Sequence, residues 1–163
     1  MRGVPVIRWA TVPGKLTGFT FLPLWEVGFG WFLMVVACTV PLLFFWFNGL
    51  HMKQYLEWGF CLVFLVFFLF LGWNLGNQRF LATIEDGRLT VSHNLREPPF
   101  SGSWPVGDWM RTEETPVQGK DQEPRFRLTL TIGSAPVHVY ESINQNEIRS
   151  LVQAFDEMKR SMP

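Results

Sequence analysis

Cysteine is scarce in this sequence, and the motifs of the common enzyme classes are missing from it. The two cysteines, Cys38 and Cys61, lie inside apolar runs and are spaced neither as a disulfide framework nor as a zinc site. We interpret them as small apolar side chains. The sequence has no glycine-rich phosphate loop, nucleophile elbow or Cys-x-x-Cys pair. We therefore expect no catalytic residue, no cofactor and no metal site, and we do not expect an enzyme.

Charge of either sign is nearly absent from the first half of the chain. The 14 basic and 14 acidic residues balance overall, which argues against nucleic acid as a partner because no basic excess is available to meet phosphates. Residues 1–75 hold only four of the basic and two of the acidic residues, and residues 76–163 hold the other ten and twelve. This asymmetry predicts that one half of the chain lies in lipid and the other in water.

Two long apolar runs in residues 25–76 predict a transmembrane helical hairpin. The runs 27–47 and 55–75 each have 21 residues, which at about 1.5 Å per residue span roughly the 30 Å of a hydrocarbon core. The joining residues 48–54 (NGLHMKQ) favour a tight turn, so the helices should be antiparallel neighbours. A buried helix pair in a soluble protein is the alternative, and the absence of a polar face on either run disfavours it.

Three details of the runs bear on mechanism. Pro41 predicts a kink in the first helix, and Gly28-Phe29-Gly30 predicts a close approach of the second helix. Neither run has an ionisable residue at its centre, so we expect no proton or ion pathway through the hairpin.

Aromatic and basic residues around the runs predict how the hairpin sits in the membrane. The expected membrane-interface anchors are Trp25, Trp31 and Trp73 at one end, and Trp46, Tyr55 and Trp58 at the other. Arg2, Arg8 and Lys15 precede the first run, whereas only Lys53 lies in the joining loop. The positive-inside rule therefore predicts that both termini are cytoplasmic.

The N-terminal segment, residues 1–24, is apolar but contains three prolines, which argues against a continuous helix. Three possibilities remain open for it: an interfacial or cytoplasmic segment lying in the headgroup layer, a strand added to the soluble domain, or a surface that packs on a partner.

Residues 78–163 predict a small soluble domain of strands followed by one helix. Residues 80–93 favour a β-hairpin around Asp86-Gly87, and 104–113 should contain a third strand. The polar stretch 114–125 is interpreted as an exposed loop.

Two further elements complete the domain. The alternation in 126–132 (FRLTLTI) is typical of a strand with one buried face, and a turn then leads into a strand at 136–140. Residues 144–159 predict an amphipathic helix, capped by Ser142 or Asn144.

The hairpin 80–93, the strand pair 126–140 and the helix 144–159, placed after a two-helix anchor, resemble bacterial membrane proteins with a pleckstrin-homology-like domain. That group includes photosynthetic-complex assembly factors. The resemblance implies a membrane α-helical hairpin plus a small α+β domain, in which one C-terminal helix closes an antiparallel sheet. It also implies a bacterial-type inner (cytoplasmic) membrane as the location.

The soluble half offers few candidates for chemistry. His93 and His138 would be neighbours if their strands paired, but a metal site needs more ligands. We interpret the acid pairs Glu85-Asp86 and Glu113-Glu114 as solvated charge, although paired carboxylates can also act as acid and base.

These observations favour a non-catalytic accessory, scaffold or assembly subunit of a larger integral membrane complex of photosynthetic or respiratory type. Its expected partners are the lipid bilayer and other integral membrane subunits, with no small-molecule substrate evident. The alternative is a membrane-tethered module that binds lipid headgroups or proteins. The scattering of basic residues among acids weakens the headgroup reading.

Overall fold

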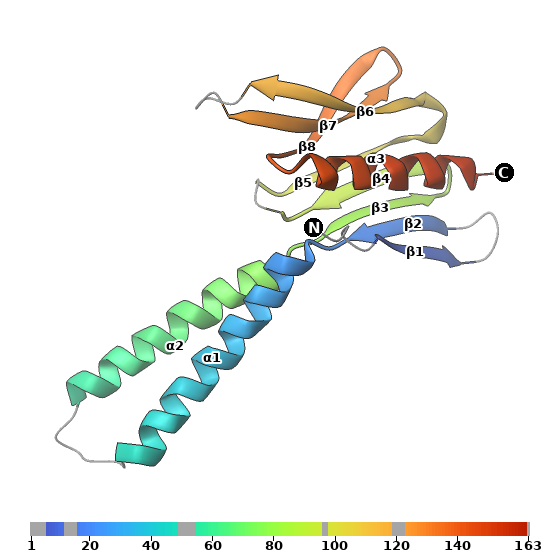
Figure 1. The fold of residues 1–163 in the computed structure, drawn as a ribbon. Helices are drawn as coiled ribbons and strands as arrows, with labels where there is room; N and C mark the ends of the chain where they lie inside the picture. The colour runs from blue at the N-terminus through green and yellow to red at the C-terminus, as the bar shows by residue number, and fades with distance from the viewer. Residues whose placement is uncertain (1–5, 12–15, 49–54, 96–97, 119–122, 163) are drawn as a thin grey trace. The chain divides into compact units, whose positions relative to one another are not determined.

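The chain folds into two compact units (Figure 1). In this computed structural model the described residues are 6–11, 16–48, 55–95, 98–118 and 123–162. Pro23–Gln78 form a pair of helices, whereas Met1–Leu22 and Arg79–Pro163 together form one α+β domain. The helical hairpin and the small α+β domain expected from the sequence are both present. The domain is discontinuous in sequence, because its first 22 residues precede the hairpin.

The hairpin consists of α1 (Leu24–Asn48) and α2 (Tyr55–Gly76), which confirms the two predicted helices. Both are long and apolar enough to cross a membrane. Pro41 lies inside α1, and the helix continues beyond it. Residues 49–54, most of the predicted turn, lie outside the described residues.

One face of α1, which includes two small residues, forms the contact with α2. The buried residues of α1 among those described, Gly30, Leu33 and Ala37, are three and four positions apart and so share one face. A Cβ atom added to Gly30 would lie 2.7 Å from the carbonyl oxygen of Gly72, whereas one added to Gly28 would meet nothing within 4 Å. The predicted close approach is therefore real at Gly30 and does not involve Gly28.

The larger sheet of the domain has five antiparallel strands in chain order. They are β1 (Val6–Thr11), β2 (Leu16–Phe21), β3 (Phe80–Glu85), β4 (Arg88–His93) and β5 (Phe100–Pro105). The predicted hairpin is confirmed, since Asp86 and Gly87 form its turn with φ of 49° and 70°. Of the three possibilities for residues 1–24, the structure shows strand addition, with two strands instead of one.

The smaller sheet has three antiparallel strands, β6 (Trp109–Gln118), β7 (Pro124–Ile132) and β8 (Ala135–Ser142). The predicted strands at 126–132 and 136–140 are confirmed and are longer than expected. The region 104–113 holds parts of two strands, because a short 3₁₀ turn, Val106–Asp108, separates β5 from β6.

The prediction of an exposed loop over 114–125 is wrong for 114–118 and 124–125, which are strand, and residues 119–122 lie outside the described residues. β6 continues to Gln118 and pairs with β7 from Pro124 onward. The polar residues belong to an edge strand that shows one face to water, and Pro116 is tolerated there because an edge strand has an unpaired side.

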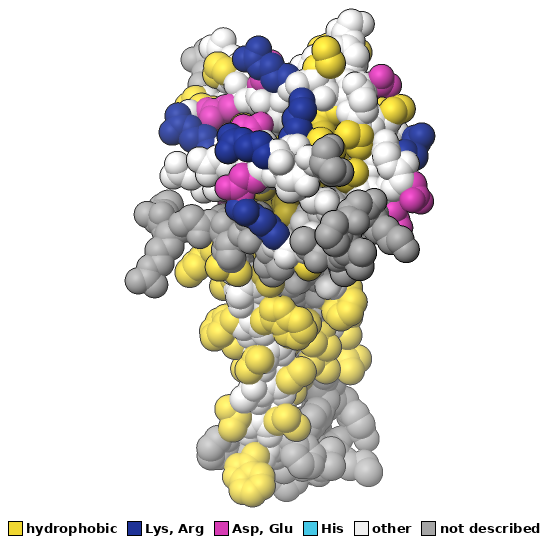
Figure 2. Space-filling model, turned by 90° about the vertical axis from the view of Figure 1, so that its right-hand side faces the viewer, with side chains coloured by type: hydrophobic (Ala, Val, Ile, Leu, Met, Phe, Trp, Pro, Cys, Tyr) yellow, Lys and Arg dark blue, Asp and Glu magenta, His cyan; other side chains and the backbone are white. Residues whose placement is uncertain are grey.

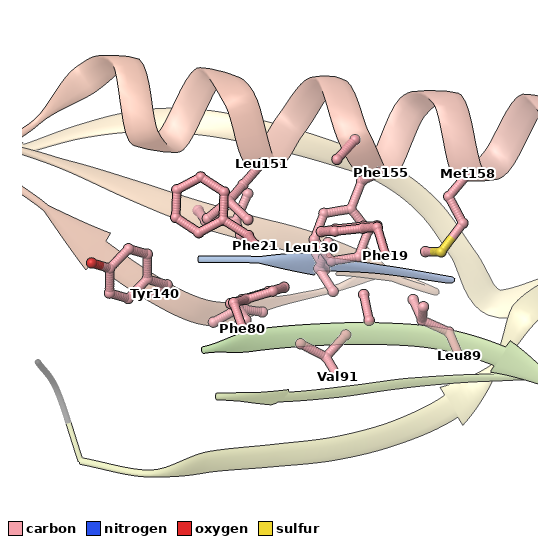
Figure 3. Close-up of a cluster of buried hydrophobic side chains, with 14 of the residues drawn as sticks. Phe19, Phe21, Phe80, Leu89, Val91, Leu130, Tyr140, Leu151, Phe155 and Met158 are labelled. Atoms are coloured by element: carbon pink, nitrogen blue, oxygen red, sulfur yellow. The ribbon is translucent and has the colours of Figure 1, made fainter. Parts of the chain in front are cut away.

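The C-terminal helix α3 (Gln145–Arg160) closes the domain, as the sequence predicted. Its N-cap is Asn144, whose side-chain oxygen accepts a hydrogen bond from the Asn146 N–H at 3.2 Å. The buried face of α3 carries Ile148, Leu151, Ala154, Phe155 and Met158. In Figure 3, Leu151 and Phe155 point from α3 into the cluster formed by aromatic residues of β2 and β3.

Strands β2 and β3 are neighbours in the sheet although the whole hairpin separates them in sequence. Their register places Phe21 opposite Phe80, the last residue of β2 opposite the first of β3. The two helices are therefore an insertion between adjacent strands, and the sheet is complete only when the chain has returned from α2.

The Phe19→Ala substitution should destabilise the domain by about 3–5 kcal/mol, because truncation of a buried aromatic leaves a cavity. Phe19 is 1% exposed and meets the Phe155 ring edge-on at 5.1 Å. Urea unfolding of the full chain in detergent, followed by near-ultraviolet circular dichroism, measures the change. Phe29→Ala, the same truncation at a 45% exposed position of α1, is the control and should leave the midpoint in place. A wild-type midpoint for Phe19→Ala would contradict a core role for β2.

Gly30→Leu should force the helices apart, because the added side chain meets the α2 backbone. The chain has two cysteines, Cys38 in α1 and Cys61 in α2, so spin labels on them report the distance between the helices. We expect a longer and broader distance distribution for Gly30→Leu and a wild-type distribution for Gly28→Leu. Equal distributions in both variants would refute the glycine contact.

Candidate functional site

One end of the five-stranded sheet carries a row of aromatic rings on its buried face. The register aligns Phe21, Phe80, His93 and Phe100 across four neighbouring strands. The His93 ring stacks between Phe80, at 5.7 Å, and Phe100, at 5.6 Å. The chain leaves for the hairpin and returns from it at this end, after Phe21 and before Phe80.

The imidazole of His93 joins the two sheets. Its Nε2 lies 2.6 Å from the carbonyl oxygen of Val139 on β8. A carbonyl only accepts, so Nε2 carries the proton and donates, which leaves the neutral ring with a lone pair on Nδ1. Nδ1 is buried and has no hydrogen-bond partner among the described residues. Burial lowers the pKa of His93 below its ordinary 6.5, and the hydrogen bond to Val139 opposes part of that effect.

A pocket of about 290 Å³ opens at the same end of the sheet. Its lining residues are Arg79, Ser92, His93, Asn94, Pro99, Phe100 and Ser101. Side chains alternate between the faces of a strand, so Ser92 and Ser101 belong to the face opposite His93 and Phe100. The pocket therefore combines a polar outer wall with the strand end that carries the imidazole.

The backbone fixes two of these polar residues as one unit. The Arg79 N–H donates to the Asn94 side-chain oxygen at 2.8 Å, and the Asn94 N–H donates to the Arg79 carbonyl oxygen at 3.1 Å. One acceptor is a side-chain oxygen, so this pair lies just beyond the β3–β4 ladder, which ends at Phe80 and His93. Arg79 is thus held at the mouth of the pocket by its main chain, and its exposed side chain is available for binding.

The structure exposes four of the six expected interface anchors. Trp25 and Trp46 are 82% exposed, and Trp31 and Trp73 are more than half exposed. The side chains of Tyr55 and Trp58 lie outside the described residues. The anchoring role of all six stays a prediction.

The two histidines singled out in the sequence do not meet. Their strands belong to different sheets, with β4 between β3 and β5, and β8 paired with β7. His138 is exposed and lies 3.3 Å from the Thr129 hydroxyl through Nδ1. Among the described residues, no three His, Cys, Asp or Glu side chains gather as metal ligands would.

The acid pairs differ from each other. Glu85 and Asp86 are exposed at the β3–β4 turn, as expected for solvated charge. Glu114 is not simply solvated, because its carboxylate accepts from Gln145 at 2.5 Å and from Arg149 at 3.2 Å. These contacts join α3 to β6. The sequence did not indicate this role because Glu114 was assigned to a loop.

Sequence reasoning missed Arg79, Ser92 and Ser101 as a group. No local motif joins them, since the pairing of β4 with β5 is what brings the two serines opposite each other. The position of Arg79, three residues beyond the end of α2, was the one available signal in the sequence. Comparison with known proteins finds no matching family model and no similar curated protein.

The free energy of unfolding should fall as the pH drops below about 6.5 and stay level above it. The lowered pKa of His93 means that the unfolded chain takes up this proton more readily than the folded domain does. Chemical denaturation of the full chain in detergent from pH 5 to 8 measures the profile. In His93→Gln, whose side-chain amide can also donate to the Val139 carbonyl, the decrease in the free energy of unfolding that is due to His93 should disappear. In His138→Gln the decrease should remain. An unchanged profile in His93→Gln would sink this assignment.

Proposed function

We propose that this protein is a non-catalytic accessory subunit, a scaffold or assembly factor, of a larger integral membrane complex of photosynthetic or respiratory type. The observation that carries the proposal is the distribution of exposed apolar side chains. Of the twenty exposed large apolar side chains among the described residues, seventeen lie on α1 and α2. In the view of Figure 2, apolar side chains cover much of the described hairpin surface, and the charged side chains visible there lie on the domain. Such a surface suits lipid and other membrane helices.

The topology supports a hairpin that crosses the membrane twice. Because β2 and β3 pair in one sheet, the segments before α1 and after α2 lie on the same side of any membrane that the helices cross. The excess of basic residues before the first span favours the cytoplasmic side for both termini, in a bacterial-type inner membrane.

The proposal includes a pleckstrin-homology-like character for the domain. Two antiparallel sheets followed by one closing helix support that reading. The described part of residues 78–163 holds six strands, and β1 and β2 bring the total to eight, one more than the seven usual in that fold. Sheet edges such as β1 and β8 suit partner binding.

The second candidate, a module that binds headgroups, has one observation in its favour, the pocket at Arg79. A broad basic surface does not support it, because four other arginines are paired with glutamates. These pairs are Arg8–Glu157, Arg111–Glu113, Arg127–Glu141 and Arg149–Glu114. Attraction to anionic lipid would have to be local to the pocket.

The full chain, tagged and extracted from native membranes in mild detergent, should co-elute at a fixed ratio with other integral membrane proteins. A helix face that binds them should depend on its aromatic anchors. We compare Phe67→Ala/Phe70→Ala on α2 with Phe29→Ala/Phe32→Ala on α1, all at exposed positions. We expect one of these two double substitutions to reduce the amount of co-eluting protein about tenfold. A reduction of this size corresponds to a loss of roughly 1.4 kcal/mol of binding free energy. Recovery solely as a free monomer would contradict the proposal.

A further inference from the structure

The pocket at Arg79 gathers hydrogen-bond donors on one small area of the sheet. Ser92 and Ser101 are directly opposed partners on β4 and β5, a relation that places their Cβ atoms roughly 5 Å apart. Arg79 and Asn94 hydrogen-bond to each other just beyond the last pair of the β3–β4 ladder, and Asn94 is two positions from Ser92. Ser92 and Ser101 share the outer face of the sheet, and Arg79 and Asn94 line the same pocket. An arginine and two serines therefore line one pocket, and none of its described lining residues carries a carboxylate.

The guanidinium of Arg79 is uncommitted. No described carboxylate pairs with it, whereas Arg8, Arg127 and Arg149 each pair with a glutamate. A second arginine on the same sheet, Arg88, donates to the Ser103 hydroxyl at 3.1 Å. Among the described arginines at this sheet, Arg8 and Arg88 use their guanidinium groups within the fold, and no such contact is found for Arg79.

One residue of this pocket, Arg79, lies close in sequence to the end of α2. Only Asn77 and Gln78 separate Arg79 from Gly76, the last residue of α2. A basic residue so close to the end of a membrane span belongs at the headgroup level. This step rests on the proposed membrane crossing of α1 and α2.

We propose that the pocket binds a phosphate ester, with the phosphate held by the Arg79 guanidinium and the Ser92 and Ser101 hydroxyls. Charged guanidinium–phosphate hydrogen bonds are strong and directional, and several phosphate oxygens match several converging donors. The volume of about 290 Å³ accommodates a phosphate with a glycerol-sized substituent. The ligand is the headgroup of an anionic phospholipid or a free phosphate ester of the same chemistry.

Calorimetric titration of the purified full chain in detergent distinguishes these two sources. The probes are a short-chain phosphatidylglycerol, a short-chain phosphatidylcholine, glycerol 3-phosphate and inorganic phosphate. Saturable 1:1 binding of phosphatidylglycerol, at least tenfold tighter than phosphatidylcholine, identifies a headgroup site. Equal affinity for glycerol 3-phosphate identifies a site for free phosphate esters. Absence of saturable binding for all four probes overturns the proposal.

Matched variants locate the site. Arg79→Gln should weaken binding at least tenfold, and Ser92→Ala/Ser101→Ala several-fold, because each removes donors to the phosphate. Arg88→Gln is the control, since Arg88 begins β4 whereas the pocket residues lie at its other end. An equal loss in Arg79→Gln and Arg88→Gln would show diffuse charge attraction and refute the site. The measurement uses the isolated chain, so its outcome does not depend on whether the protein belongs to a complex.

Discussion

The pairing of β2 with β3 is the constraint on which the rest of the structure depends. Phe21 and Phe80 are opposite each other, so two segments separated by the whole hairpin must meet in one sheet. This pairing requires that α2 ends close to where α1 begins, so that β3 can start beside the end of β2. It also brings Phe19 and Phe21 into the core beneath α3, where both are almost completely buried. The helical hairpin is therefore an insertion within the sheet of the domain, although the two form separate compact units.

Short connections make the sheet and the helix contact depend on each other. Leu22 and Pro23 alone join β2 to α1, and three residues join α2 to β3. Neighbouring strands are about 4.8 Å apart, whereas packed helices are about 8–10 Å apart. Linkers this short tolerate only a small difference between the two spacings. Gly30 and Gly72 allow the backbones of α1 and α2 to approach closely in the half of the hairpin that adjoins these linkers.

Local patterns predicted the elements that local forces specify. The apolar runs, the Asp86-Gly87 turn, the alternation in β7 and the amphipathic stripe of α3 each showed in a short window of sequence. The role of residues 1–22 could not be predicted in this way, because β2 finds its partner β3 almost 60 positions later. The second half of β6 was not predicted, because an edge strand with one solvent-exposed face can have the same polar composition as a loop. The polar cluster at Arg79 was missed because strand register, not a motif, creates it.

Internal charge pairing decides what the domain can recognise. Arg8 pairs with Glu157 and Arg149 with Glu114, so ion pairs hold α3 to β1 and to β6. The Lys159 ammonium donates to the Trp109 and Met110 carbonyl oxygens at 3.0 and 2.6 Å, and so is also occupied within the fold. Exposed pairs of this kind add little stability, but they cancel the long-range field of a chain whose net charge is zero. A domain without such a field can recognise a ligand only through short-range contacts, and the pocket proposed as a phosphate site offers them through Arg79 and two opposed serines.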